Sequence, residues 1–306
     1  MLNSSDDCHV FRCLPEDGSD DPTKGKGIAD AVGQLGADYA VNGHQLTIDT
    51  RFGRFPELND TDVHLWQVVL SCGVDQQQTY YATLSSDERA RADRFKFEHL
   101  RHRFIIGRGV LRELLGRYLA IAPGEIRFTY GRYGKPTLDQ AVHSTSISFN
   151  LSHSNTMALL VFCRKGMIGV DVEHIRSSVD ALALSKRFFT PHEYHHICSC
   201  ASEQAIAEFF RLWTCKEAYL KATGEGLAGL QTIEVDVKGD AEPSVRVHQR
   251  SINTQPHRSY AWNLAQCQPS PNYVGAIALG VEQQQHSLLS LSPTLNRLQQ
   301  FVYLQL

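Results

Sequence analysis

RLWTCKEAYLKATGEG, residues 211–226, is the stretch of sequence that constrains the fold most. Together with the two residues before it, this stretch predicts an amphipathic helix with 3.6 residues per turn. The bulky apolar residues that share one face are Phe209, Phe210, Trp213 and Leu220. Glu217 and Lys221 lie on or beside that face, where an unpaired carboxylate is costly to bury. The position of Glu217 therefore needs an explanation beyond helix packing.

Strands alternate with helices on both sides of this helix, which we expect over about 203–222. An arginine-rich helix is expected over about Ser86–His102 and another over about Phe104–Leu119. Strands are expected at residues 62–70, 125–130, 147–154, 158–163, 168–173, 232–237 and 272–280. Links such as SNTM and RKGM are too short for crossovers, so we expect antiparallel sheets.

The order of a helix followed by strands occurs twice, at about 104–160 and 205–280, which favours two similar halves. The predicted fold class is α+β, with small, mainly antiparallel sheets packed with helices. Residues 1–60 are polar and Gly-rich, and we expect a poorly ordered extension there with a hairpin around Asn42-Gly43. The two halves are expected at 61–165 and 166–306.

Composition excludes several classes of protein. The 306 residues carry a formal net charge of -3, so no global attraction to nucleic acid or to a membrane is indicated. The N-terminus lacks the cationic start and apolar core of a signal peptide, and no apolar run approaches the roughly 20 residues of a membrane-spanning helix. Eight scattered cysteines without a C-x-x-C pair predict free thiols in a reducing cytoplasm.

The stretch IGVDVEH, residues 168–174, places two carboxylates on one face of a strand. Because side chains alternate along a strand, Gly169, Asp171 and Glu173 point to the same side. Adjacent carboxylates repel unless a cation joins them, and Mg²⁺ prefers such oxygen ligands together with phosphates. Gly169 would allow a bulky anion to approach closely. The alternative is a half-exposed strand face that carries two acids.

Glu217 strengthens the metal hypothesis, because a carboxylate on the inner face of a helix is explained if it completes the same site. Lys221, one turn further along, would then reach a phosphate oxygen that the metal also holds. The alternative is an ordinary i, i+4 ion pair, worth a few tenths of a kcal/mol. An ion pair explains the spacing of Glu217 and Lys221, but not why they share a stripe with Trp213.

Other polar residues are candidates for an anion site. Lys135 lies in a Gly-Pro turn, YGRYGKPTL, where its ammonium would project from a rigid loop, although most such lysines are simply solvated. Ser152 and His153 lie where a strand runs into a turn, and a histidine there is more often structural than catalytic. The arginine-rich helix contains acids as well, which favours a small anion site over a nucleic-acid groove.

The stretch HEYHH, residues 192–196, fits the H-E-x-x-H signature of zinc proteases. Thr190, Pro191 and Glu193 give a simpler explanation, since they form the capping box that begins a helix. The nearby Cys198 and Cys200 do not have the spacing of a standard zinc site. A protease therefore remains a minor alternative.

Taken together, five motifs resemble those of the Sfp-type 4′-phosphopantetheinyl transferases. They are YGKP (133–136), FNLSHS (149–154), IGVDVE (168–173), RFFTPHEY (187–194) and LWTCKEAYLKATGEGL (212–227). Their order and spacing agree with the family over about residues 61–285. The resemblance implies two similar α/β halves packed as a pseudo-dimer, a monomeric chain, and coenzyme A bound in the cleft between the halves.

The resemblance also implies a set of site residues. Asp171, Glu173 and Glu217 match the magnesium ligands of the family. The positions that match coenzyme A contacts are Arg91, Arg103, Lys135, Ser152, His153, Lys216 and Lys221. A further basic position of the family, three residues before Arg91, is occupied by Glu88, so this chain departs from the family pattern there.

The implied reaction transfers phosphopantetheine from coenzyme A to a serine of an acyl or peptidyl carrier protein in fatty acid, polyketide or nonribosomal peptide synthesis. Adenosine 3′,5′-bisphosphate is released. Glu217, directly or through a metal-bound water, is the candidate general base. Lys221 and Asp171 complete the expected catalytic set. The alternative from another class is a non-catalytic module that binds coenzyme A or a nucleotide, although binding alone would not require all three carboxylates.

Overall fold

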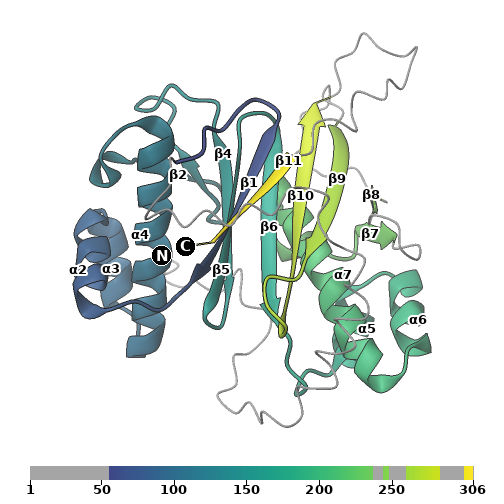
Figure 1. Cartoon of the computed structure of the whole chain (residues 1–306). Coiled ribbons are helices and arrows are strands. Elements are labelled where there is room, and N and C mark those ends of the chain that lie inside the picture. The colour runs from purple at the N-terminus through teal and green to yellow at the C-terminus, as the bar shows by residue number, and fades with distance from the viewer. Residues whose placement is uncertain (1–54, 237–243, 248–259, 283–299, 306) are drawn as a thin grey trace, which may run out of the picture.

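A computed structural model describes residues 55–236, 244–247, 260–282 and 300–305 (Figure 1). Helices lie on the two outer sides and two sheets face each other between them, so the layers run helix, sheet, sheet, helix (Figure 1). The expected hairpin around Asn42-Gly43 lies outside the described residues. No helix in the described ranges has both the length and the apolar character needed to cross a membrane.

The first half begins with the strand β1 and ends with the strand β5. Its elements are β1 (Asp62–Val69), α2 (Val74–Thr83), α3 (Ser86–Asp93), α4 (Glu98–Leu119), η1 (Pro123–Glu125), β2 (Phe128–Tyr130), β3 (Pro136–Leu138), β4 (Ser148–Ser154) and β5 (Met157–Cys163). The second half repeats this order. Its elements are β6 (Met167–His174), α5 (Ala181–Phe188), α6 (Pro191–Ser199), α7 (Ser202–Thr223), η2 (Leu227–Gly229), β7 (Ile233–Asp236), β8 (Ser244–Val247), β9 (Tyr260–Cys267) and β10 (Tyr273–Glu282).

The two larger sheets have matching strand orders. The first sheet has the order β11-β1-β5-β4 and the second has the order β6-β10-β9. All these pairings are antiparallel except that of β1 with β11 (Gln300–Gln305), which is parallel. The predicted α+β class and the repeated halves are therefore confirmed. The short link RKGM leads from one sheet into the other, so β5 and β6 are not hydrogen-bonded neighbours.

Three large apolar clusters hold the layers together. One joins α4 to the outer face of the first sheet, a second joins α7 to the outer face of the second sheet, and the third lies between the sheets. The third cluster contains Ile168, Val170 and Val172 of β6. The predicted alternation along β6 is therefore confirmed, and Gly169, Asp171 and Glu173 face α7.

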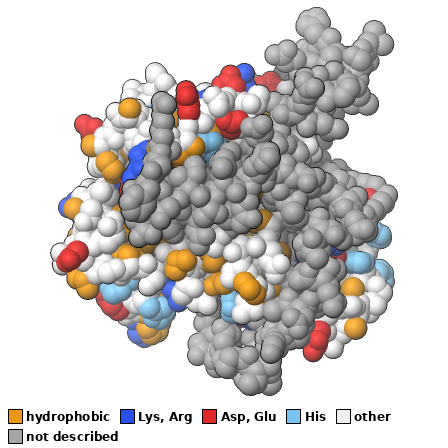
Figure 2. Space-filling model, in the orientation of Figure 1, with side chains coloured by type: hydrophobic (Ala, Val, Ile, Leu, Met, Phe, Trp, Pro, Cys, Tyr) orange, Lys and Arg blue, Asp and Glu red, His pale blue; other side chains and the backbone are white. Residues whose placement is uncertain are grey.

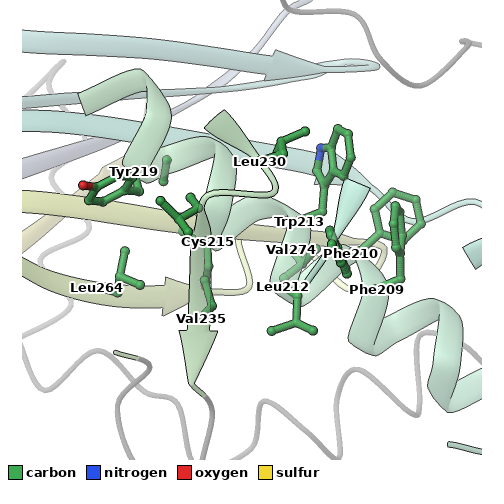
Figure 3. Packing of buried hydrophobic residues seen from close by; sticks show 14 of the residues in the cluster. Phe209, Phe210, Leu212, Trp213, Cys215, Tyr219, Leu230, Val235, Leu264 and Val274 are labelled. Atoms are coloured by element: carbon green, nitrogen blue, oxygen red, sulfur yellow. The ribbon is translucent and has the colours of Figure 1, made fainter. Parts of the chain in front are cut away.

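The helix α7 is buried on all sides, so the prediction of an amphipathic helix is wrong. Between Ala205 and Ala222, every residue except Ile206 is buried. One side packs on β6 and β10, while α5, α6 and β7 cover the other side. Figure 3 shows Leu212 and Cys215 among side chains from surrounding strands, with Phe209, Phe210 and Trp213 grouped at one end. A second covering layer removes the need for a polar face.

Several predicted boundaries differ from the structure. The arginine-rich helix ends at Asp93 and a new helix begins at Glu98. Between them, the ring of Phe95 lies 5.4 Å from that of Phe104. Residues 55–60 pack on the first half, where Leu58 is 2% exposed and Phe55 stacks on Trp66. The six cysteines in the described ranges are free thiols, as predicted.

Gly169 sets the distance between β6 and α7. A Cβ at this position would lie 2.1 Å from the carbonyl oxygen of Ala218 and 2.4 Å from the backbone nitrogen of Ala222. The space that the sequence analysis assigned to an anion is therefore filled by the helix backbone. Close contact of the two backbones explains why a glycine stands here.

Gly169→Ala should lower the free energy of unfolding by about 3 kcal/mol or more, because the clashing atoms belong to backbone that cannot rotate away. Urea denaturation followed by circular dichroism measures this change. Gly124→Ala is the matched control, since no described atom lies within 4 Å of its Cβ position. An unchanged urea midpoint for the Gly169 variant would show that α7 does not rest on β6 as described.

Candidate functional site

β6 is an outer strand of its sheet, and the edge that faces away from β10 pairs with no other strand in the described ranges. Side chains of β4 accept hydrogen bonds from the backbone N–H groups along this edge. The backbone N–H of Val170 donates to Oδ1 of Asn150 at 3.0 Å. The N–H groups of Val172 and His174 donate in the same way to the hydroxyls of Ser152 and Ser154, at 3.4 and 3.0 Å. These three side chains alternate along β4, so all of them face the edge of β6. We refer to this contact as the β4–β6 seam.

Two hydroxyls of the seam also hold the carboxylates of β6. Ser152 donates to Oδ1 of Asp171 at 2.8 Å, and Ser154 donates to Oε2 of Glu173 at 2.9 Å. Asp171 is 3% exposed, and its second oxygen, Oδ2, has no hydrogen-bond partner within the described part of the chain. The seam therefore links the two halves and orients both acids.

Lys221 reaches this group from α7. Its Nζ donates to the Ser152 hydroxyl at 2.8 Å and forms an ion pair with Oδ1 of Asp171 at 2.5 Å. Burial opposes the charged form of Lys221, but the nearby carboxylates, Asp171 first among them, outweigh burial and raise its pKa. The lysine therefore lies in the cluster as the cationic partner of Asp171.

Glu217 is 5% exposed and makes no hydrogen bond or ion pair with any described residue. Burial raises its pKa to about 8 against the lowering effect of Lys221, and the charges of Asp171 and Glu173 add to the rise. Burial and the charge of Asp171 likewise raise the pKa of Glu173 to about 8. The three carboxylates thus lie close enough to influence one another. Asp171 is paired with Lys221, and Glu173 has a longer contact, at 4.0 Å, with Nη2 of Arg176.

The chemistry of the cluster suits a hard divalent cation. The unpartnered Oδ2 of Asp171 and the carboxylate of Glu217 are oxygen donors of the kind that Mg²⁺ prefers. Within the described ranges, however, no three His, Cys, Asp or Glu side chains are already arranged to hold a metal ion. In this structure the ammonium of Lys221 binds one carboxylate oxygen of the cluster, Oδ1 of Asp171.

Lys135 and Lys216 make different contacts from those expected of ligand-binding residues. Nζ of Lys135 donates to the carbonyl oxygens of Ile168 at 3.1 Å and Ala222 at 3.0 Å. Lys216 is fully buried, and its Nζ binds Oε2 of Glu193 at 2.6 Å and the carbonyl of Ile233 at 2.7 Å. The structure therefore does not bring Lys216 to the acidic cluster.

The contacts of Lys216 have a counterpart in the first half. Arg112 and Lys216 are each the fifteenth residue of a 22-residue helix. Arg112 Nε binds Oε2 of Glu88 at 2.7 Å, and Glu88 closes a capping box at the start of α3, as Glu193 does at the start of α6. Glu88, which stands at a basic position of the resembled family, is thus committed to a structural ion pair.

Arg91, Arg103 and His153 come from three elements of the first half, α3, α4 and β4. Nη2 of Arg103 donates to Oδ1 of Asn155 at 3.0 Å, in the turn after β4, and Arg91 lies over the ring of Phe104 at 5.2 Å. His153 is exposed and lies on the opposite face of β4 from the buried Ser152. The structure therefore brings Ser152 into the cluster but not its neighbour.

The HEYHH segment does not form a zinc site. His192 and His196 face separate carboxylates, Glu234 at 3.8 Å and Glu208 at 2.9 Å. Glu193, the residue that would act as base in a protease, is 2% exposed and held in the predicted capping box. Histidine side chains lie at the surface near α6, at the right of Figure 2. The capping-box prediction is confirmed.

Sequence reasoning missed two residues of the seam, Asn150 and Ser154. The signal was present in FNLSHS, where Asn150, Ser152 and Ser154 recur at every second position, with Phe149, Leu151 and His153 between them. The alternation could be interpreted only once the fold showed that one edge of β6 pairs with no other described strand.

Comparison with known proteins identifies the family of the chain. Residues 167–278 match the family model described as the 4′-phosphopantetheinyl transferase superfamily, and residues 73–164 match the one described as 4′-phosphopantetheinyl transferase, N-terminal. The 4′-phosphopantetheinyl transferase HetI of Nostoc sp. is 44% identical over 218 residues, which cover 71% of this chain and 87% of HetI. The chain therefore belongs to the 4′-phosphopantetheinyl transferase family of enzymes.

A more distant relative carries the same description. The 4′-phosphopantetheinyl transferase Sfp of Bacillus subtilis is 26% identical over 56% of this chain and 75% of its own length. A solved structure titled Chronobacterium ammoniagenes ACPS-CoA complex is 20% identical, with a TM-score of 0.31 over 38% of this chain and 97% of its own. Membership of the family rests on the sequence matches.

The raised pKa values predict how stability depends on pH. Burial raises the pKa values of Glu217 and Glu173 in the folded chain to about 8, from an ordinary value of 4.5. The unfolded state then binds fewer protons between these values, so the free energy of unfolding falls as pH rises from about 5 to 8. Glu217→Gln should remove part of this slope, on the order of 1 kcal/mol per pH unit.

Urea denaturation in the presence of a chelator, at several pH values, measures the slope. Glu113→Gln is the matched control, because Glu113 occupies the same place in α4 as Glu217 in α7 but is exposed and paired with Arg117 at 2.8 Å. Equal slopes for the wild-type protein and the Glu217 variant would contradict the electrostatic description of the cluster.

Proposed function

We propose that the chain transfers the 4′-phosphopantetheine group of coenzyme A to a serine hydroxyl of an apo acyl or peptidyl carrier protein, with Mg²⁺ as the required ion. Family membership supports the transferase activity. The observation that carries the rest is the acidic cluster at the β4–β6 seam, where three carboxylates from two elements converge beside a buried lysine. A non-catalytic module that only binds coenzyme A or a nucleotide would not require three neighbouring carboxylates.

Asp171, Glu173 and Glu217 are the residues proposed to hold the ion, since they offer oxygens of which few are occupied. When bound, Mg²⁺ would neutralise charge on the pyrophosphate of coenzyme A. Two features of the chain prepare this site. Ser152 and Ser154 fix the two acids of β6, and the closely packed α7 brings Glu217 to the same side.

Glu217 is proposed as the base toward the serine of the carrier. A general base works best when its pKa lies near the working pH, and burial raises that of Glu217 to about 8. The serine proton passes to Glu217 as the serine oxygen bonds to the phosphorus, and the phosphoanhydride bond breaks to release adenosine 3′,5′-bisphosphate. Lys221, oriented by Ser152, would stabilise the charge on the departing phosphate.

Arg91, Arg103 and His153 are proposed to hold the phosphate groups at the adenosine end of coenzyme A. They come from α3, α4 and β4, at positions that match those of the family. We further propose that the protein works as a monomer in the cytoplasm, which is in keeping with the free thiols of the described cysteines. Its carriers would belong to fatty acid, polyketide or nonribosomal peptide synthesis.

The direct test incubates the protein with coenzyme A, Mg²⁺ and a panel of apo carrier proteins, and reads the modified serine by mass spectrometry. Glu217→Gln and Lys221→Met should each lower turnover by about 10²–10³, as loss of a preorganised electrostatic group does. Glu113→Gln and Arg117→Met alter the exposed pair at the same places of α4 and should leave turnover unchanged. Full turnover in excess chelator would remove the ion from the proposal.

A second prediction separates the transferase from a zinc protease. The double variant His192→Gln/His196→Gln should keep carrier modification within a few-fold of the wild-type rate, because both side chains lie at the surface and face separate carboxylates. The same carrier assay measures it. A dead double variant, together with a normal Lys221 variant, would overturn the transferase mechanism.

A further inference from the structure

The turn between β2 and β3 crosses from the first half to the end of α7 in the second half. Lys135, at the end of this turn, donates to the carbonyl oxygens of Ile168 and Ala222. Tyr133 lies against the loop after α7, since its ring is 3.3 Å from the position of a Cβ on Gly226. Gly226 has a φ of 69°, so the loop bends here in a way that favours glycine. The turn therefore contacts the end of α7 at two places.

Both carbonyls that Lys135 binds need a partner. Ala222 is the second-to-last residue of α7, and the last four carbonyls of a helix have no partner within it. The carbonyl of Ile168 points to the free edge of β6, the same edge on which Asn150 and Ser152 bind N–H groups. Lys135 thus extends the β4–β6 seam and ties it to the end of the helix.

The charge of Lys135 is costly to bury. Burial lowers its pKa to about 8, and it forms no ion pair within the described ranges. The C-terminal end of a helix carries partial negative charge and stabilises a cation placed there. The end of α7 therefore stabilises the ammonium, together with the carbonyl of Ile168 on β6.

Lys221 directly precedes Ala222, so whatever fixes the carbonyl of Ala222 also fixes the backbone that carries Lys221. Helix ends fray unless they are held by caps or by tertiary contacts. We infer that Lys135 is a positioning residue that holds the last turn of α7 against β6, so that Lys221 stays on Ser152 and Asp171. In this role it does not contact coenzyme A itself. The catalytic consequence rests on the proposed function, whereas the mechanical part does not.

The mechanical part is tested without substrate by hydrogen exchange of the full-length protein. In Lys135→Met the amides of Gly224 and Glu225, which donate to the carbonyl of Leu220, should exchange about tenfold faster than in the wild type. Lys165→Met is the matched control, because Lys165 is exposed and pairs with Asp60 at the surface. Unchanged exchange at the end of α7 would overturn the inference, whether or not the protein modifies a carrier.

The catalytic part is tested by separating binding from turnover. Lys135→Met should lower kcat by about 10- to 100-fold, as small misplacements of a catalytic group do. The Kd for coenzyme A, measured by calorimetry, should stay within threefold of the wild type. Lys135→Arg, which keeps donors for both carbonyls, should recover part of kcat and also serves if the Met variant does not fold. A Kd raised tenfold or more with kcat unchanged would show a direct ligand contact and overturn the inference.

Discussion

The side-chain hydrogen bonds between β4 and the free edge of β6 are the contact on which the site depends. An unpaired strand edge is normally a liability, since its N–H and C=O groups invite another strand. Here Asn150, Ser152 and Ser154 take the place of that strand, and Lys135 completes the row. A hydroxyl can accept one hydrogen bond and donate another. The serine hydroxyls that accept hydrogen bonds from β6 therefore also donate to Asp171 and Glu173 and orient them.

The two halves show what distinguishes an active site from a core built on the same frame. The strands β1 and β6 each have eight residues, and their fifth and seventh residues face the long helix of their own half. In β1 these are Trp66 and Val68, which belong to the apolar cluster under α4. In β6 they are Asp171 and Glu173. In the first half these two positions therefore contribute to the apolar core, whereas in the second half they carry two neighbouring acidic side chains.

Local rules predicted much of this from sequence. The period of two placed Asp171 and Glu173 on one face, and the capping-box spacing correctly began α6. The destinations of Lys135 and Lys216 were not predictable in this way, because each binds carbonyls that are distant in sequence and become available only after folding. The prediction that α7 is amphipathic was wrong for a related reason. Periodicity shows which face is more apolar, whereas a second covering layer is a property of the tertiary fold.

The parallel pairing of β11 with β1 has a consequence for synthesis on the ribosome. β1 is among the first described elements to be made and β11 is the last. One edge of β1 can pair with β5 once residues 157–163 have been made, whereas the partner of the other edge is made only with residues 300–305. For most of translation, the first sheet therefore presents an open edge that a chaperone or a neighbouring nascent chain can occupy.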